Sequence, residues 1–375
     1  MRVGIIGAGI GGLCTAVGMQ VAGHEVVVFE KAEELRPVGS GLSVFANGLR
    51  ALDSLGLGEA FRSITSTRAG ALRAGQRRPD GRWLATIPAD AVRELRIVHR
   101  ADLHRILVDA LAPGTIRLGT EVRPPDALGR LTTASGSERF DLVVAADGIR
   151  SRVRASWPGD PGIRYSGYST WRGITDGPVD LLGAAGETWG RGLRFGLAPL
   201  VDDRVYWFAV ASMPADSTID DEFAAVVERF GGWHDPIPAI IAATSPDTVF
   251  RLDINDLAGP LPTFRRDNCV LLGDAAHAMT PDLGQGGGQA MEDAATLVAL
   301  VRTEPDLDAA LERYDRLRRA RTQPIARRAR MLGSVAQSSG RLSAALRDAV
   351  FRMTPAGATA RQVRSVQEWD PPTAA

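Results

Sequence analysis

Cysteine is scarce in this sequence of 375 residues, in which only Cys14 and Cys269 occur. The two lie far apart, and neither belongs to a CxxC pair or to a Cys/His cluster. This pattern argues against a disulfide framework, a structural zinc site and an iron–sulfur cluster. We therefore expect no metal site and a chain suited to a reducing compartment.

Net charge is lacking as well, since 44 Lys and Arg residues balance 44 Asp and Glu residues. A neutral chain creates no long-range field that would attract nucleic acid or an acidic membrane. The sequence also has no charged leader with an apolar core and no apolar run of about 18 residues, the length that a spanning helix needs. We therefore expect a cytoplasmic protein, a monomer or homodimer, with a small ligand and no nucleic-acid or membrane partner.

The first 30 residues have the pattern of a dinucleotide-binding unit. An apolar strand over residues 1–6 leads into GAGIGG, an apolar-periodic helix follows to about residue 22, and a second strand over 25–29 ends at Glu30. The glycine motif alone would be weak evidence. Strand, glycines, helix, strand and acid in this order make it specific.

Each residue of this motif has a physical reason. Gly7 permits the tight turn, Gly9 lets the backbone approach a pyrophosphate, and Gly12 lets helix and strand pack closely. Glu30 would accept hydrogen bonds from the adenosine ribose hydroxyls, and its carboxylate disfavours a 2′-phosphate. The unit therefore predicts FAD or NAD rather than NADP.

A second ligand-binding stretch covers residues 273–293 and reads GDAAHAMTPDLGQGGGQAMED. It follows a strand over 267–272, so the carboxylate of Asp274 stands at a strand end, where it suits a ligand's hydroxyls. Its glycines precede a helix, and side-chain-free backbone beside a helix N-terminus suits negative charge on a ligand.

Two more features point to a large ligand. The apolar strand DLVVAADGIRSRVR, over residues 141–154, runs into Asp147 and Gly148, which by themselves could be only a turn. Arg100 stands in the first turn of a helix expected over 99–111, where the helix dipole disfavours a cation. An anionic partner would explain Arg100, and a solvated side chain is the alternative.

The rest of the chain predicts a sheet and further helices. Short strands near residues 70–75 and 82–87 and the β-like runs of 163–257, interrupted by a helix over 221–230, favour a mixed or antiparallel sheet. A glycine-rich loop with an amphipathic helix is expected over 37–56, and helices over 288–303 and 307–321. The arginine-rich run that follows, to about residue 330, is typical of a solvated helix face. We expect residues 355–375 to be loosely held.

Three spaced motifs, GAGIGG with its acid, DLVVAADGIRSRVR and LLGDAAHAMTPDLGQGGGQAMEDA, together resemble the single-component FAD-dependent aromatic hydroxylases, or class A flavoprotein monooxygenases. The resemblance runs from residue 1 to about 330 and is greatest to short members such as urate, salicylate and 6-hydroxynicotinate hydroxylases and zeaxanthin epoxidase. It implies an α/β fold with a Rossmann-like FAD-binding domain of the glutathione-reductase type, an inserted mixed β-sheet substrate domain and C-terminal helices. The implied segments are 1–70, 99–160 and 261–330 for FAD binding, 71–98 and 161–260 for the substrate domain, and 331–375 for a C-terminal helix and tail.

The resemblance also assigns residues to the cofactor. It implies that the GAGIGG glycines and the acid bind the ADP half of FAD. Arg100 would contact the pyrophosphate or ribityl region, and Asp274 would bind a ribityl hydroxyl. The loop 281–287 would lie against the isoalloxazine ring. The full set implied to bind FAD is Gly7, Gly9, Gly12, Glu30, Lys31, Gly41, Arg100, Asp147, Gly148, Asp274, Gly284, Gly286 and Gly287.

The implied activity is an NAD(P)H- and O2-dependent hydroxylation through a flavin C4a-hydroperoxide. An epoxidase, an oxygen-independent flavin dehydrogenase or reductase, and an idle FAD-binding protein remain as alternatives. The helix that starts at Gly287 would stabilise the anionic reduced flavin, and an apolar sheet would exclude water. His277 invites a catalytic role, but the family uses this position structurally.

The substrate is a small aromatic or heteroaromatic ring in this interpretation. Arg194, Tyr206, Pro281 and Asp282 fall where short members place their reactive site. An Arg and a Tyr facing a flavin suit a planar, anionic, electron-rich ring, although both are also ordinary residues of a sheet. The urate enzymes have an Asn in the string that reads Trp-Arg-Gly here, and Arg172 in its place argues against urate.

Overall fold

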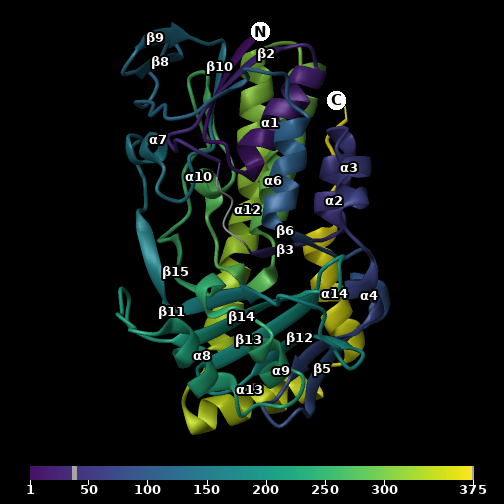
Figure 1. Ribbon diagram of the computed structural model, residues 1–375. Helices are drawn as coiled ribbons and strands as arrows, with labels where there is room; N and C mark the ends of the chain where they lie inside the picture. The colour runs from purple at the N-terminus through teal and green to yellow at the C-terminus, as the bar shows by residue number, and fades with distance from the viewer. Residues whose placement is uncertain (36–39, 374–375) are drawn as a thin grey trace.

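The computed structural model describes residues 1–35 and 40–373. Residues 37–39 of the expected glycine-rich loop therefore lie outside the described part. The molecule contains two large sheets, one in the upper and one in the lower half of Figure 1. The long helix α12 (Leu307–Ala336) extends from the upper half to the lower half. No helix in the described ranges is both long and apolar enough to cross a membrane.

The first sheet has six strands in the order β16-β17-β10-β1-β2-β7. All neighbours pair in parallel except β16 with β17, as expected for a doubly wound nucleotide-binding fold. Its strands are β1 (Arg2–Ile6), β2 (Glu25–Phe29), β7 (Ile116–Arg117), β10 (Leu142–Ala145), β16 (Arg265–Arg266) and β17 (Cys269–Leu271).

The second sheet has seven strands in the order β15-β11-β14-β13-β12-β4-β5 and is mixed, because β4 and β12 pair in parallel while the other neighbours are antiparallel. Its strands are β4 (Arg73–Arg77), β5 (Trp83–Ile87), β11 (Ile163–Ile174), β12 (Ala184–Trp189), β13 (Leu193–Pro199), β14 (Val205–Ser212) and β15 (Phe250–Leu257). Two ribbons complete the β structure, β3 (Gly41–Val44) with β6 (Arg96–His99) and β8 (Arg130–Thr133) with β9 (Gly136–Arg139).

Helices fill the space around both sheets. The remaining ones are α1 (Ile10–Val21), α2 (Ala46–Ser54), α3 (Gly58–Ser63), α4 (Arg68–Ala71), α5 (Ala89–Val92), α6 (Arg100–Asp109), α7 (Arg152–Ala155), α8 (Glu222–Phe230), α9 (Ile237–Ala242), α10 (Asp274–His277), α11 (Gly286–Thr303), α13 (Arg341–Met353) and α14 (Ala356–Gln367), with the 3-10 turns η1 (Pro246–Thr248) and η2 (Pro281–Leu283).

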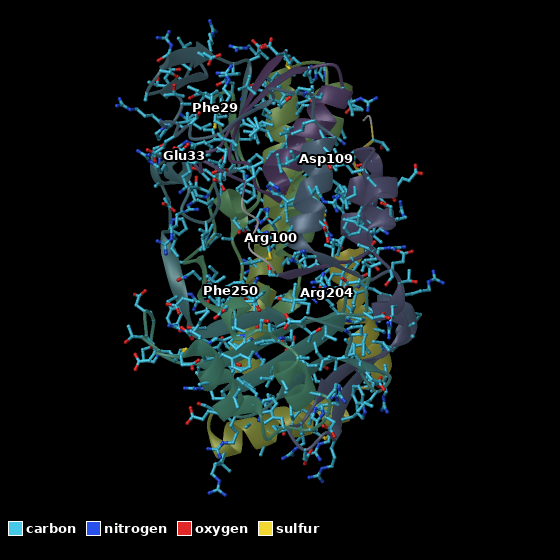
Figure 2. All side chains as sticks on the ribbon, in the orientation of Figure 1. Phe29, Glu33, Arg100, Asp109, Arg204 and Phe250 are labelled. Carbon is cyan, nitrogen blue, oxygen red and sulfur yellow. The ribbon has the colours of Figure 1, made fainter. Side chains whose placement is uncertain are left out.

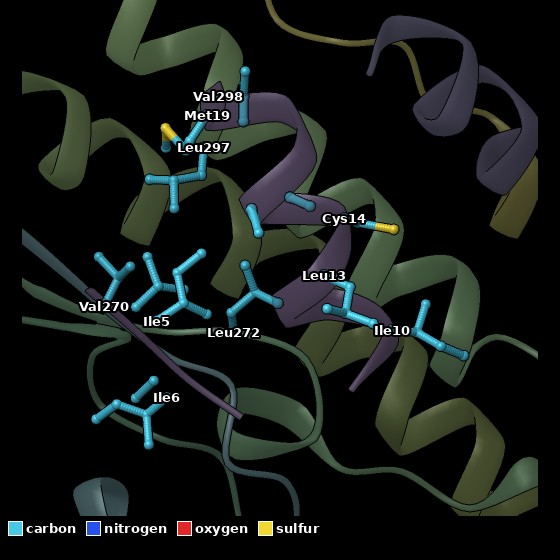
Figure 3. Packing of buried hydrophobic residues seen from close by; sticks show 14 of the residues in the cluster. Ile5, Ile6, Ile10, Leu13, Cys14, Met19, Val270, Leu272, Leu297 and Val298 are labelled. Carbon is cyan, nitrogen blue, oxygen red and sulfur yellow. The ribbon is translucent and has the colours of Figure 1, made fainter. Parts of the chain in front are cut away.

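The first core lies where α1 is held between the parallel sheet and α11. Figure 3 shows side chains of α1 beside Ile5 and Leu272 of the strand region and Val298 of α11. Small residues allow this close approach, since a Cβ on Gly11 would lie 2.5 Å from Leu272 and one on Gly18 would lie 2.8 Å from Val298. Helix α1 is therefore buried along most of its length.

The second core lies on one face of the mixed sheet, under α8 and α9. Trp171, Phe195 and Trp207 point to this face, and the Phe195 and Trp207 rings stack at 5.4 Å. Because side chains alternate along a strand, their neighbours Arg194, Tyr206 and Phe208 share the opposite face. That face meets the first half of the molecule.

Two expectations about the C-terminal part were wrong. The second of the two expected helices does not end near residue 321, because α12 continues past Pro324 to Ala336. The arginine-rich run is only partly solvated, since Arg327 is exposed whereas Arg330 donates to Asp256 at 2.8 Å. The last stretch is not loosely held, because it forms α14, from which the Gln367 carbonyl accepts a hydrogen bond from Arg50 at 2.5 Å.

Candidate functional site

The turn between β1 and α1 has the geometry of a phosphate site. Gly7 has φ +103°, and a Cβ there would lie 2.4 Å from the Ala146 carbonyl oxygen. A Cβ on Gly12 would lie 2.1 Å from the Gly7 oxygen, whereas a Cβ on Gly9 would meet no described atom within 4 Å. Gly9 caps α1 without a side-chain hydrogen bond. The first N–H groups of α1 are thus free to bind an anion.

The acid at the end of β2 lies at this turn. Glu30 accepts hydrogen bonds from the backbone N–H of Ala8 at 2.8 Å and of Ala32 at 3.0 Å. These bonds fix the carboxylate and leave it lone pairs for a ligand's hydroxyls. Lys31 is exposed next to it.

Only one oxygen of the Asp147 carboxylate has a hydrogen-bond partner among the described residues. Its Oδ2 accepts the Arg152 N–H at 2.9 Å at the start of α7, but its buried Oδ1 has no hydrogen-bond partner among the described residues. Gly148, with φ +78°, turns the chain away after β10. A buried carboxylate oxygen that accepts no hydrogen bond from the protein is suited to accept one from a ligand.

Three charged side chains from separate elements meet at the middle of the molecule, where Figure 2 labels Arg100. Desolvation lowers the pKa of Arg100, as does the charge of Arg172 on β11, while the Asp274 carboxylate opposes the shift. Arg100 and Asp274 are exposed to solvent, and the backbone N–H of Arg100 donates to Ser40 at 2.8 Å. The group can therefore hold a polar, negatively charged chain.

The loop 281–287 ends in a helix N-terminus without a side-chain cap. Gly284 has φ +63°, and a Cβ there would lie 3.1 Å from the Phe45 ring. A Cβ on Gly286 would meet nothing within 4 Å, and one on Gly287 would lie 3.0 Å from Leu42. The N–H groups at the start of the 18-residue helix α11 are therefore accessible and carry its positive dipole end.

Arg194 connects the mixed sheet to this loop. Its Nη2 lies 2.7 Å from the Asp282 Oδ1, its Nε donates to Gln337 at 2.9 Å, and its Nη1 lies 3.5 Å from Glu187. Burial would lower the pKa of Arg194, but the carboxylates of Glu187 and Asp282 raise it. All three guanidinium nitrogens thus face protein partners, so a substrate oxyanion would have to compete with Asp282.

Asp282 has a second partner on β11. Tyr168 donates its hydroxyl to Asp282 Oδ2 at 2.6 Å. Burial raises the pKa of Tyr168, and the carboxylate raises it further, so the phenol stays protonated. The adjacent Pro281 is exposed.

Tyr206 is buried on β14 against the cofactor half. A Cβ on Gly41 of β3 would lie 2.3 Å from its ring, so the two elements are in direct contact. Burial raises the pKa of Tyr206, and the nearby Arg172 opposes that shift. The buried Nε of Arg172 has no hydrogen-bond partner among the described residues. The side chains of Tyr206 and Arg172 could therefore form hydrogen bonds with a ligand.

Residues 1–329 match the family model described as an FAD binding domain. The aurachin C monooxygenase/isomerase of Stigmatella aurantiaca is 35% identical over 94% of this chain and of its own. The 2-heptyl-3-hydroxy-4(1H)-quinolone synthase of Pseudomonas aeruginosa is 34% identical over 95% of this chain and 94% of its own. The structure of Klebsiella pneumoniae HpxO with FAD and uric acid superposes with a TM-score of 0.87 at 30% identity, covering 98% of this chain and 96% of that one. The chain belongs to the class A FAD-dependent monooxygenases.

Membership confirms the family resemblance, the α/β fold and FAD as the cofactor. The monooxygenase is one of the enzymes that hydroxylate aromatic or heteroaromatic rings. No group of three or more His, Cys, Asp or Glu side chains that could hold a metal ion occurs in the described ranges.

Beneath the loop 281–287, the monooxygenase has a buried polar network that the sequence did not reveal. Glu292 of α11 accepts hydrogen bonds from Asn47 at 2.6 Å and Arg318 at 2.7 Å, and pairs with Arg321 at 2.5 Å. Asn47 also donates to Gln285 at 2.9 Å, the residue that precedes the glycines of α11. The network thus fixes where α11 begins.

Asp293 links the two ends of the 273–293 stretch. Its carboxylate accepts the Gly273 N–H at 2.8 Å, lies 2.6 Å from His277 Nε2 and accepts Arg318 Nε at 2.5 Å. Burial would raise the pKa of Asp293, but His277 and Arg318 lower it below its ordinary value. His277 is buried in this cluster.

Proposed function

We propose that this enzyme uses NAD(P)H and O2 to hydroxylate a planar heteroaromatic ring held between the loop 281–287 and the face of the mixed sheet that carries Arg194 and Tyr206. One observation carries the proposal. The 2.7 Å ion pair between Arg194 and Asp282 places that face directly against the loop that begins α11.

FAD fits the residues of the first half. The open approach at Gly9 and the free end of α1 suit its pyrophosphate, and Glu30 suits the adenosine ribose. Arg100 and Asp274 suit the phosphate and ribityl region, and the unsatisfied Asp147 Oδ1 suits a hydroxyl or N–H donor. When bound, FAD would supply the redox chemistry of a monooxygenation, in which NAD(P)H gives two electrons, one oxygen atom of O2 enters the ring and the other leaves as water.

The protein's own groups then have separate tasks. The N–H groups of Gly286 and Gly287, with the dipole of α11, would stabilise negative charge on the reduced cofactor. Tyr168 and Arg194 hold Asp282, and through it the loop, in one position. The apolar side chains around Tyr206 and Phe208 keep water away from the reacting atoms.

The substrate contacts fall to Arg172 and Tyr206 rather than to Arg194. Arg194 is already neutralised by carboxylates, whereas the buried Nε of Arg172 lacks a partner. A hydroxylated or oxo-substituted ring could accept hydrogen bonds from both. The name of the quinolone synthase, which matches 95% of this chain, supports a fused nitrogen heteroaromatic as one substrate class, beside the purine of the urate hydroxylases, which match 88%.

Anaerobic stopped-flow reduction tests the proposal. Flavin reduction by NADH and by NADPH is measured with phenols, hydroxybenzoates, hydroxypyridines, purines and 4-quinolones, and we expect one class to accelerate it. Turnover under isotopically labelled O2 must then place one labelled atom in the product. Substrate-stimulated oxidation without labelled product would assign the protein to dehydrogenases instead.

Two variants test the residue roles. Asp274→Ala should lose FAD affinity, since a ribityl hydroxyl would lose its acceptor. Arg172→Met should keep FAD but raise the KM for the aromatic substrate roughly ten-fold, the effect of one lost charge-assisted hydrogen bond. A wild-type KM in Arg172→Met would remove this residue from the substrate site.

A further inference from the structure

Helix α13 has its apolar side facing solvent. Leu342, Leu346, Val350 and Met353 are 87%, 67%, 48% and 73% exposed. Their spacing of four, four and three residues places all of them on one stripe of the helix. Figure 1 shows α13 at the end of the molecule away from the N-terminus, where the described chain leaves its outer side uncovered.

Two charged side chains of α13, Arg347 and Asp348, face the protein instead. Arg347 donates to the carbonyls of Gly190 and Ala336, both at 2.9 Å, and pairs with Asp348 at 2.8 Å. Arg78 lies 3.3 Å from Asp348 on the same inner side. Turning the helix to bury its leucines would break these buried bonds, so the outward stripe is a fixed part of the fold.

The surroundings of the stripe are basic. The one acid of α13, Asp348, is buried and paired with Arg347, so the helix exposes no carboxylate of its own. Arg341 and Arg352 are exposed on α13 itself. Arg341 occupies the first position of the helix, where a cation is disfavoured unless an anion neutralises it.

We propose that α13 docks the monooxygenase on an anionic phospholipid surface, with the stripe in the headgroup boundary and Arg341 and Arg352 on lipid phosphates. An amphipathic helix with an apolar face and flanking arginines has this behaviour. A second copy of the chain fits less well. It would bring the same arginines together, and a stripe about 20 Å long and one side chain wide covers far less than the roughly 800 Å² per partner of a stable interface.

Vesicle flotation of the FAD-loaded enzyme tests the proposal, using phosphatidylcholine vesicles with and without phosphatidylglycerol. We expect the enzyme to float only with the anionic vesicles and to be released near 1 M salt, where the Debye length falls to about 3 Å. Arg341→Gln should weaken binding about five-fold, the contribution of one arginine near such a surface.

Leu346→Glu removes the apolar contact and should abolish flotation. Leu182→Glu, at an exposed leucine outside the C-terminal helices, is the matched control and should float as wild type. Both variants should keep bound FAD and the wild-type melting temperature, because each site is exposed. Failure of the wild type to bind anionic vesicles would overturn the proposal. So would a concentration-dependent dimer, seen by sedimentation, that Leu346→Glu dissociates.

Discussion

Asp282 lies between two side chains of the mixed sheet, since it forms an ion pair with Arg194 at 2.7 Å and accepts a hydrogen bond from Tyr168 at 2.6 Å. The side chain of Asp282 is fully buried, so its charge depends on these neighbours. The loop 281–287 is thus held by β11 and β13, the strands that also carry the proposed substrate residues or their neighbours.

Replacing Arg194 by Ala should destabilise the enzyme and impair its reaction. The change leaves Glu187 and Asp282 buried without their cation, at a cost of about 3–5 kcal/mol. Urea denaturation measures the loss, and stopped-flow reduction should show weakened stimulation by the aromatic while the protein remains yellow. Arg191→Ala, at an exposed position of the preceding turn, should change stability by less than about 0.5 kcal/mol. Wild-type stability and turnover in Arg194→Ala would contradict the role of the ion pair.

Gly9→Ala and Gly12→Ala should impair different properties, the first FAD binding and the second the stability of the apoprotein. The new methyl at position 9 meets no protein atom, so the apoprotein should melt as wild type, while FAD affinity falls about ten-fold or more because the pyrophosphate approach is blocked. The methyl at position 12 strikes the Gly7 oxygen, so the apoprotein itself should lose stability. Melting of the apoproteins and FAD titration separate the two effects. An unchanged FAD affinity in Gly9→Ala would place the pyrophosphate elsewhere.

Gly41→Ala should reveal the contact with Tyr206. Its Cβ would lie 2.3 Å from the ring, and such overpacking costs about 1–3 kcal/mol. Tyr206→Ala in the same chain should recover part of the loss, which a double-mutant cycle measures. Gly177→Ala, with nothing within 4 Å, is the control. Additive losses in the double variant would show that the two residues do not touch.

Arg318→Gln should make the enzyme sensitive to acid. The pKa values of Glu292 and Asp293 are lowered in the folded state despite burial, so their stabilisation is complete above the ordinary carboxyl range and is lost as pH falls through the folded values. Without Arg318 the folded pKa values rise, and the acid-unfolding midpoint should move to higher pH. Circular dichroism against pH measures it. Arg327→Gln, on the exposed side of α12, should leave the midpoint unchanged.

The nucleotide half could be predicted from the sequence because its signals are local. Gly7, Gly12 and Glu30 lie within one short strand-turn-helix-strand segment, and the structure brings all three to the turn between β1 and α1. The FAD-binding fold followed from this spacing and from the family resemblance.

The polar network could not be predicted because its partners are far apart in the chain. Asn47 and Glu292 are separated by 245 positions, and Arg194 and Gln337 by 143. Arg318 lies in a run of arginines whose other members are largely accessible, and only the packing of α12 on α11 selects it for burial. A C-terminal helix was expected within 331–375, but the pattern did not give the bounds of α13, whose apolar residues face outward instead of inward.

The lack of a side chain at Gly333 of α12 restricts which residues related enzymes can have at the positions around it. A Cβ at this position would lie 2.4 Å from Asp282 Oδ2 and 2.6 Å from the Tyr168 hydroxyl oxygen. Any relative with a larger residue here must therefore also change its tyrosine or its aspartate, or shift the loop away from the helix. Substitutions at these three positions should covary across the family, although they stand far apart in the sequence.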